Sequence, residues 1–204
     1  MKKWFLLPGM GATSTMYDGL LSEIDFQVNL LDWPEYRGEP TYGDVAKRVI
    51  EEYDISDGDI VGGSSLGGMV ALEMANLIRP KAIVLLGSAV NRREIQSALS
   101  TLAPLAAVAP LASMQILVGK HQSLVAQMFT QSDPEFFRNM CMYLPSWPGY
   151  SGAHEGLFRL RGRKDRIILC PARGATVVEN AGHLLTITHP RETGLFLKSV
   201  CEYD

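Results

Sequence analysis

The residues best suited to chemistry lie where a short apolar run meets a helical segment. The sequence there reads Gly63-Ser64-Ser65-Leu66-Gly67, which is the pattern G-x-S-x-G. Small residues two positions before and after Ser65 permit a sharp turn between strand and helix, which raises the serine hydroxyl above a sheet. The start of the helix also brings backbone N–H groups to that hydroxyl. Ser65 is therefore the candidate nucleophile.

The glycines of this turn do not fit a phosphate-binding loop. No register of Gly62, Gly63, Gly67 and Gly68 gives G-x-G-x-x-G. Met69 stands where a P-loop carries a lysine. We therefore expect neither a nucleotide nor another cofactor at this turn, and no metal ion.

A serine hydroxyl is a weak nucleophile and needs an adjacent base, for which histidine is the first candidate. His121 lies in a Lys-His-Gln context that is typical of a solvated helix face, and His189 precedes Pro190 at the start of a helix. His154 precedes the fifth predicted strand, at the wrong end of the sheet. His183 follows the last apolar run and therefore lies at a carboxyl end of a strand. His183 is the predicted base.

The base needs an acid that fixes its tautomer and stabilises its charged form. The fourth predicted strand ends in Gly87-Ser88-Ala89, which contains no carboxylate. The turn after the fifth strand contains one carboxylate, Asp165, among cationic neighbours that we expect to keep it ionised. Asp165 is the predicted third member of a Ser-His-Asp triad.

Acyl transfer on a serine also needs two N–H donors for the negative oxygen that forms on the substrate. Leu66, the residue after the nucleophile, is expected to supply one of them. The other is expected from Met10, in the turn Pro8-Gly9-Met10-Gly11 after the first apolar run. We also expect Met10, Leu66 and Trp147 to contact the substrate.

Short apolar runs alternate with helical segments and position these residues. Strand, helix, strand with short connections predicts a mostly parallel sheet between two layers of helices, an α/β/α sandwich. The strands read as continuous apolar runs, as expected for strands buried on both faces. The predicted strands are 3–7, 28–31, 59–61, 82–86, 157–160 and 176–178, and the predicted helices are 13–21, 42–53, 66–78 and 190–200.

Residues 91–150 interrupt the alternation with helical and proline-rich segments. Residues 95–119 carry no charge, but Pro104 and Pro110 divide them and polar side chains dilute them, so buried helices are favoured over a membrane span. We expect one domain, 1–204, with a helical lid at about 91–150 that favours medium acyl chains. In the alternative, this stretch packs on the domain or forms a dimer interface.

Composition excludes other functional classes. The chain has 204 residues, 47% hydrophobic and 20% charged, with a net charge of -3. It lacks the concentrated basic face that nucleic-acid binding requires. Three widely spaced cysteines, Cys141, Cys170 and Cys201, favour a reducing, cytoplasmic location over a disulfide framework. The apolar run 4–7 breaks at Pro8, which favours a first strand over a signal peptide.

The order Ser, Asp, His, together with these turns, resembles the α/β-hydrolase superfamily over nearly the whole chain. The resembling segments are 5–11 (oxyanion turn), 63–68 (nucleophile elbow), 161–167 (acid turn) and 178–183 with His189-Pro190 (histidine loop). Pro8-Gly9 stands where the family usually has His-Gly, and the amino-terminal hairpin of the full fold is absent. The resemblance implies six parallel strands in the order 2-1-3-4-5-6, and small bacterial hydrolases and carrier-protein methyl esterases are similar.

Serine rather than aspartate as the nucleophile argues against a dehalogenase or an epoxide hydrolase. The sequence favours hydrolysis of a carboxylic ester or thioester, with a small-molecule substrate that is either free or attached to a carrier protein. An acyltransferase would use the same triad. A binding protein that has kept the fold without catalysis is the alternative from another class.

Overall fold

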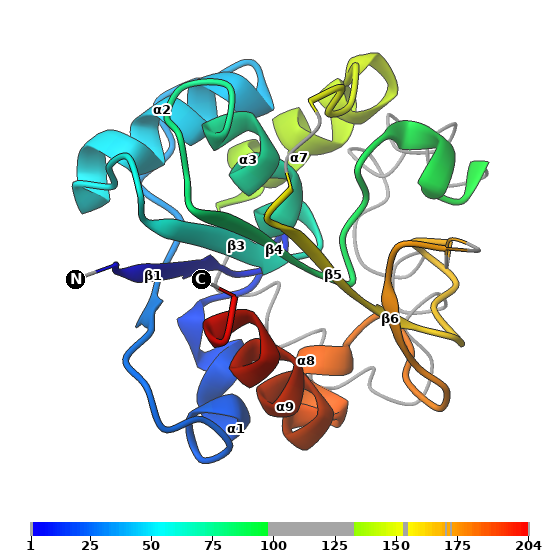
Figure 1. The fold of residues 1–204 in the computed structure, drawn as a ribbon. Helices are drawn as coiled ribbons and strands as arrows, with labels where there is room; N and C mark the ends of the chain where they lie inside the picture. The colour runs from blue at the N-terminus through cyan, green and yellow to red at the C-terminus, as the bar shows by residue number, and fades with distance from the viewer. Residues whose placement is uncertain (1, 98–132, 153–154, 170, 172, 204) are drawn as a thin grey trace.

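The computed structural model describes residues 2–97, 133–152, 155–169, 171 and 173–203. Within them, six strands form one parallel sheet in the order β2-β1-β3-β4-β5-β6. Figure 1 labels β1, β3, β4, β5 and β6 of this sheet. The predicted order is confirmed. The strands are β1 (Trp4–Leu7), β2 (Asn29–Leu30), β3 (Ile60–Ser64), β4 (Ala82–Leu86), β5 (Leu157–Gly162) and β6 (Thr176–Val178).

Helices cover both faces of the sheet and form the outer layers of the predicted sandwich (Figure 1). One face carries α2 (Tyr42–Tyr53), α3 (Leu66–Met74) and α7 (Pro134–Tyr143). The other carries η1 (Ser14–Tyr17), α1 (Asp18–Leu21), α8 (Leu185–Thr188) and α9 (Pro190–Cys201). The fold class is the predicted α/β/α architecture.

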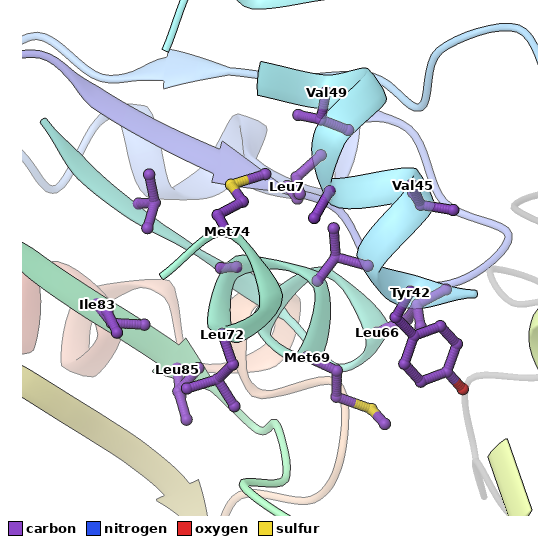
Figure 2. Close-up of a cluster of buried hydrophobic side chains, with 14 of the residues drawn as sticks. Leu7, Tyr42, Val45, Val49, Leu66, Met69, Leu72, Met74, Ile83 and Leu85 are labelled. Carbon is purple, nitrogen blue, oxygen red and sulfur yellow. The ribbon is translucent and has the colours of Figure 1, made fainter. Parts of the chain in front are cut away.

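The core is divided by the sheet because successive strand residues point to opposite faces. Leu7, Ile83 and Leu85 face α2 and α3, whereas their strand neighbours Leu6 and Val84 face the α1–α9 layer. Figure 2 shows side chains of α2 and α3 lying over Leu7, Ile83 and Leu85. Because both faces are covered, β3 and β4 are buried along their whole length.

Some boundaries differ from the predicted ones. Helix α3 ends at Met74 instead of residue 78, because Asn76 and Leu77 bond back to Glu73 and Met74 in tight turns. Strand β2 has two residues rather than four. The short helix α8, just after His183, was not predicted because four residues are too few to show a helical period.

Only the two ends of the predicted insertion belong to the described part of the chain. The first end contains η2 (Arg92–Glu94), and the second contains α7 and η4 (Leu144–Ser146). Residues 98–132, which hold most of the uncharged stretch and of the predicted lid, lie outside the described residues. Among the residues that are described, no helix has the length and apolar character needed to cross a bilayer.

Helix α7 begins at a well-formed cap. The carboxylate of Asp133 accepts hydrogen bonds from the N–H groups of Glu135 and Phe136, at 2.8 and 3.3 Å. Pro134 occupies the first helical position, where a missing N–H costs nothing. The cap directs the buried face of the helix, with Phe136 and Met140, onto the α2–α3 layer.

Candidate active site

Ser65 lies on the turn that joins β3 to α3, with φ 52 and ψ -117. A positive φ is sterically unfavourable for serine and costs about 1–3 kcal/mol, so the surrounding structure must impose it. The Ser65 N–H donates to the Leu86 carbonyl at 3.1 Å, and the Ser65 carbonyl accepts from the N–H of Gly68 at 3.1 Å. These bonds fix the turn from both sides.

The glycines around Ser65 are required by close backbone packing. A β-carbon placed on Gly63 would lie 2.5 Å from the Leu7 carbonyl oxygen. One placed on Gly67 would lie 2.5 Å from the same oxygen and 2.5 Å from that of Pro8. The elbow therefore sits directly against the end of β1, and larger residues at these positions would push the two apart.

His183 lies between Ser65 and Asp165 in space, as the sequence predicted. Its Nε2 lies 3.0 Å from the Ser65 Oγ, and its Nδ1 lies 2.9 Å from the Asp165 Oδ2. Because a carboxylate can only accept, Nδ1 carries the proton, and Nε2 is left to accept the serine hydroxyl proton. The structure thus brings together the three side chains in the arrangement that general-base activation of a serine requires.

Asp165 is held in a buried, ionised state. Its second oxygen, Oδ1, accepts from the N–H groups of Ile167 and Ile168, at 2.8 and 2.9 Å. Burial alone would raise the pKa of Asp165, but the charge and hydrogen bond of His183 and the two N–H groups together lower it. The contribution of the cationic neighbours Arg163, Lys164 and Arg166 to keeping Asp165 ionised stays a prediction. Arg163 pairs with Glu179, and Lys164 bonds to Asn180.

The two predicted oxyanion donors lie at the same end of the sheet as Ser65. Leu66 opens α3, so its N–H has no carbonyl one turn earlier in the helix. A β-carbon on Gly9, the residue before Met10, would lie 3.7 Å from the Ser65 Cβ. The turn after β1 is therefore packed against the nucleophile.

Helix α7 contacts this oxyanion turn. The Cys141 thiol lies 3.7 Å from the Met10 sulfur. Burial raises the pKa of Cys141 to about 12, so it stays a neutral, weakly polar packing group.

Trp147, predicted to contact the substrate, is placed differently. Its side chain is 1% exposed and its indole N–H donates to Glu73 at 2.7 Å. Its ring packs beside Tyr42, with centroids 5.8 Å apart. These contacts fasten the end of the insertion to α2 and α3, and they give Trp147 a structural position within the core.

Two groups of residues around the site were not predicted. The first braces the oxyanion turn: Trp33 donates from Nε1 to the Gly9 carbonyl at 3.1 Å, and the Met16 sulfur accepts from the Gly9 N–H at 3.2 Å. Tyr17 donates to the Leu7 carbonyl at 2.6 Å. Trp33 lies shortly after the end of β2, and this position was the sequence feature that could have indicated a role at the site.

The second group fastens the start of the insertion to the acid turn. Glu94 accepts from Arg159 at 2.6 Å and from Arg161 at 2.7 Å, and the Arg161 side chain is 0% exposed. The adjacent backbone continues the link, because the Leu169 N–H donates to the Glu94 carbonyl and the Gln96 N–H donates to the Ile167 carbonyl. Arg159 and Arg161 alternate on β5, but nothing in the sequence indicated their partner.

A cavity of about 190 Å³ adjoins the oxyanion turn. Its lining includes the aromatic residues Trp33, Tyr36 and Phe136 and the acidic residues Asp32, Glu35 and Asp133. Within the described ranges, no group of three or more histidine, cysteine or carboxylate side chains has a geometry that could hold a metal ion.

Several solved structures share this fold. A thermophilic esterase from Thermogutta terrifontis has 16% identity and a TM-score of 0.74, over 100% of this chain and 90% of that chain. A hydrolase from Oleispira antarctica has 14% identity and a TM-score of 0.78, over 98% and 91%. The enol-lactonase from Burkholderia xenovorans has 15% identity and a TM-score of 0.75, over 99% and 92%.

At sequence identities of 14%, 15% and 16%, the similarity to these three structures shows a shared fold alone. No curated protein matches the chain in sequence. The model of the Alpha/beta hydrolase family, however, matches residues 4–193, which is nearly the whole chain. The chain therefore belongs to the alpha/beta hydrolase family.

Proposed function

We propose that the protein hydrolyses a carboxylic ester or thioester through an acyl-enzyme on Ser65. The observation that carries the proposal is the continuous chain of contacts from the Ser65 Oγ through His183 to Asp165, at 3.0 and 2.9 Å. Similarity in fold to an esterase and an enol-lactonase agrees with it, because both names describe action on an ester carbonyl.

In the first half of the reaction, the Ser65 Oγ attacks the carbonyl carbon while His183 Nε2 takes the hydroxyl proton. The carbonyl oxygen becomes negative and is stabilised by the N–H groups of Leu66 and Met10. The tetrahedral intermediate then collapses and breaks the bond from carbon to the leaving oxygen or sulfur. The leaving group departs with the proton from His183.

In the second half, a water molecule attacks the acyl carbon and gives a proton to His183. The second tetrahedral intermediate breaks the bond to the Ser65 Oγ, which recovers its proton from His183. The acid is released and the enzyme is restored. Asp165 stays ionised throughout and stabilises the imidazolium that forms twice in each cycle.

The test is covalent labelling of the nucleophile. A fluorophosphonate probe should label wild type and fail to label Ser65→Ala, and hydrolysis of p-nitrophenyl esters should fall by about 10⁶-fold in kcat. Ser88→Ala is the matched control, because Ser88 is a buried serine at the neighbouring strand end and should leave both readouts unchanged. Undiminished labelling of Ser65→Ala would rule out Ser65 as the nucleophile.

A panel of p-nitrophenyl esters and acyl thioesters of graded chain length then defines the substrate class. Each methylene that becomes buried is worth about 0.8 kcal/mol, or roughly fourfold in kcat/KM. If kcat/KM rises with acyl chain length and stops rising at one length, that length measures the size of the acyl pocket. Preference between the oxygen and sulfur esters would identify the leaving group.

A further inference from the structure

We propose that Trp33 is a positioning residue for the oxyanion hole: its indole N–H orients the Gly9–Met10 peptide so that the Met10 N–H can serve as a donor. This inference rests on the proposed function, since it concerns the same oxyanion. It gives a specific task to a residue outside the triad and outside the predicted oxyanion turn.

The contact is made to the peptide unit that carries the donor. The Gly9 carbonyl accepts from the Trp33 Nε1 at 3.1 Å and from the Ala12 N–H at 3.1 Å. The Gly9–Met10 bond is trans, so the Gly9 carbonyl and the Met10 N–H point in opposite directions. Fixing the carbonyl on the Trp33 side therefore fixes the direction of the N–H on the other side.

The peptide needs this restraint because it follows a glycine. Gly9 has no side chain to limit its φ and ψ, and the neighbouring Gly11 already adopts φ 75. The N–H of Gly9 is held separately by the Met16 sulfur, at 3.2 Å. The two peptide units that flank Gly9 are thus fastened from different elements, one by η1 and the other by the loop after β2.

The same contact strengthens the donor electronically. A carbonyl that accepts two hydrogen bonds polarises its peptide unit, and the N–H of that unit becomes a better donor. A negative oxygen on the substrate would benefit from this more than a neutral ester carbonyl. The contact should therefore raise kcat rather than strengthen substrate binding.

Trp33 is itself held in place by α7. Its ring lies 5.0 Å from the ring of Phe136, centroid to centroid, and Phe136 is buried. From the same helix, Cys141 contacts the Met10 side chain. The end of the insertion thus supports the oxyanion turn at two points, once through Trp33 and once directly.

The experiment compares Trp33→Phe with Tyr36→Phe. Trp33→Phe keeps an aromatic ring against Phe136 and removes the N–H donor. Tyr36 also packs on Phe136, at 5.7 Å, and its hydroxyl donates to the Glu39 carbonyl, away from the turn. The Tyr36 hydroxyl also accepts from the Asn139 side chain in α7 at 2.8 Å. The Tyr36→Phe control therefore loses two hydrogen bonds, neither of them to Gly9, and keeps its ring packing.

We expect Trp33→Phe to lower kcat by about 10-fold to 100-fold, less than the 10²–10³ lost when a donor is removed outright. KM should change by less than about twofold, because ground-state contacts are unaltered. Affinity for a boronic acid inhibitor, which imitates the tetrahedral intermediate, should fall by the same factor as kcat/KM. Tyr36→Phe should match wild type in all three measurements.

Wild-type kcat and boronate affinity in Trp33→Phe would overturn the proposal, as would an equal loss in Tyr36→Phe. If Trp33→Phe does not fold, Met16→Leu serves instead, because it frees the Gly9 N–H while keeping side-chain volume. A lower kcat at unchanged KM would then support the restraint of Gly9, and wild-type kcat would overturn it. Absence of Ser65-dependent turnover in wild type would refute the proposed function itself, independently of these ratios.

Discussion

Nδ1 of His183 lies 2.9 Å from Oδ2 of Asp165, and the other oxygen of that carboxylate is occupied by the N–H groups of Ile167 and Ile168. The carboxylate therefore cannot rotate without losing two bonds. Asp165→Asn would place an amide in this fixed position and could turn its NH₂ toward His183. The imidazole would then carry its proton on Nε2, where it could no longer accept from Ser65.

We expect Asp165→Asn to fold and to lose about 10⁴-fold in kcat, because the histidine is in the wrong tautomer. Steady-state hydrolysis of a p-nitrophenyl ester measures the loss, and circular dichroism checks the fold. Glu179→Gln is the control, since Glu179 is an exposed carboxylate paired with Arg163 of the acid turn. Full activity of Asp165→Asn would mean that another acid orients His183.

Acid stability should also depend on Asp165. Because its pKa is lowered in the folded protein, the unfolded chain takes up a proton at higher pH than the folded one does. The stabilisation is thus present above the ordinary aspartate pKa of about 3.9 and is lost as pH falls through the lower folded value. Urea unfolding should show the difference between wild type and Asp165→Asn shrinking below about pH 4. A constant difference across pH 3–7 (about the accessible range) would contradict the assignment.

The contacts among Ser65, His183 and Asp165 could be predicted from the sequence because each residue lies beyond the carboxyl end of a strand. Ser65 directly follows β3, Asp165 lies in the turn after β5 and His183 lies in the loop after β6, and parallel strands bring such ends to one edge of the sheet. Local patterns therefore predicted the three side chains that meet, whereas the strand order came from the family resemblance.

The supporting residues could not be predicted in this way. Glu94 and Arg161 are 67 residues apart, and Trp33 reaches Gly9 across 24 residues. Neither contact produces a periodic or local sequence pattern, because each forms only when distant segments come together in the folded protein. Trp147 shows the same limit: we expected it to contact the substrate, and its N–H donates to Glu73, which is 74 residues away in the sequence.

Gly67→Ala should disrupt the elbow. Its β-carbon would lie 2.5 Å from two carbonyl oxygens at the end of β1, and neither backbone can move cheaply. We expect destabilisation of about 1–3 kcal/mol or more, together with loss of activity as Ser65 shifts. Thermal unfolding and ester hydrolysis measure the two effects.

Gly43→Ala is the control for Gly67→Ala, because it adds the same β-carbon at a position with room for it. Gly43 lies in α2, where a β-carbon would have only ordinary contacts, the nearest at 3.6 Å. Alanine should therefore stabilise the helix by about 0.5–1 kcal/mol and leave activity unchanged. Similar losses in the two variants would show that any added β-carbon is harmful, and that the elbow has no special requirement.

Glu94→Gln should destabilise both the start of the insertion and the acid turn. The variant keeps its shape but removes the carboxylate charge that Arg159 and the fully buried Arg161 contact, and breaking a buried pair typically costs about 3–5 kcal/mol. The backbone of residues 94–96 is bonded to Ile167 and Leu169, next to the N–H groups that hold Asp165. Loosening this segment should therefore also lower kcat.

Asp25→Asn is the matched control for Glu94→Gln, because Asp25 pairs with Lys198 at 3.7 Å with 81% of its side chain exposed. An exposed pair of this kind contributes about 0–1 kcal/mol. Urea unfolding compares the two variants, and added salt should diminish the small Asp25 effect while leaving the Glu94 effect largely intact, since buried charges are screened less. Equal stability of the two variants would show that the arginines find other partners when Glu94 is neutral, and that the cluster does not hold the acid turn.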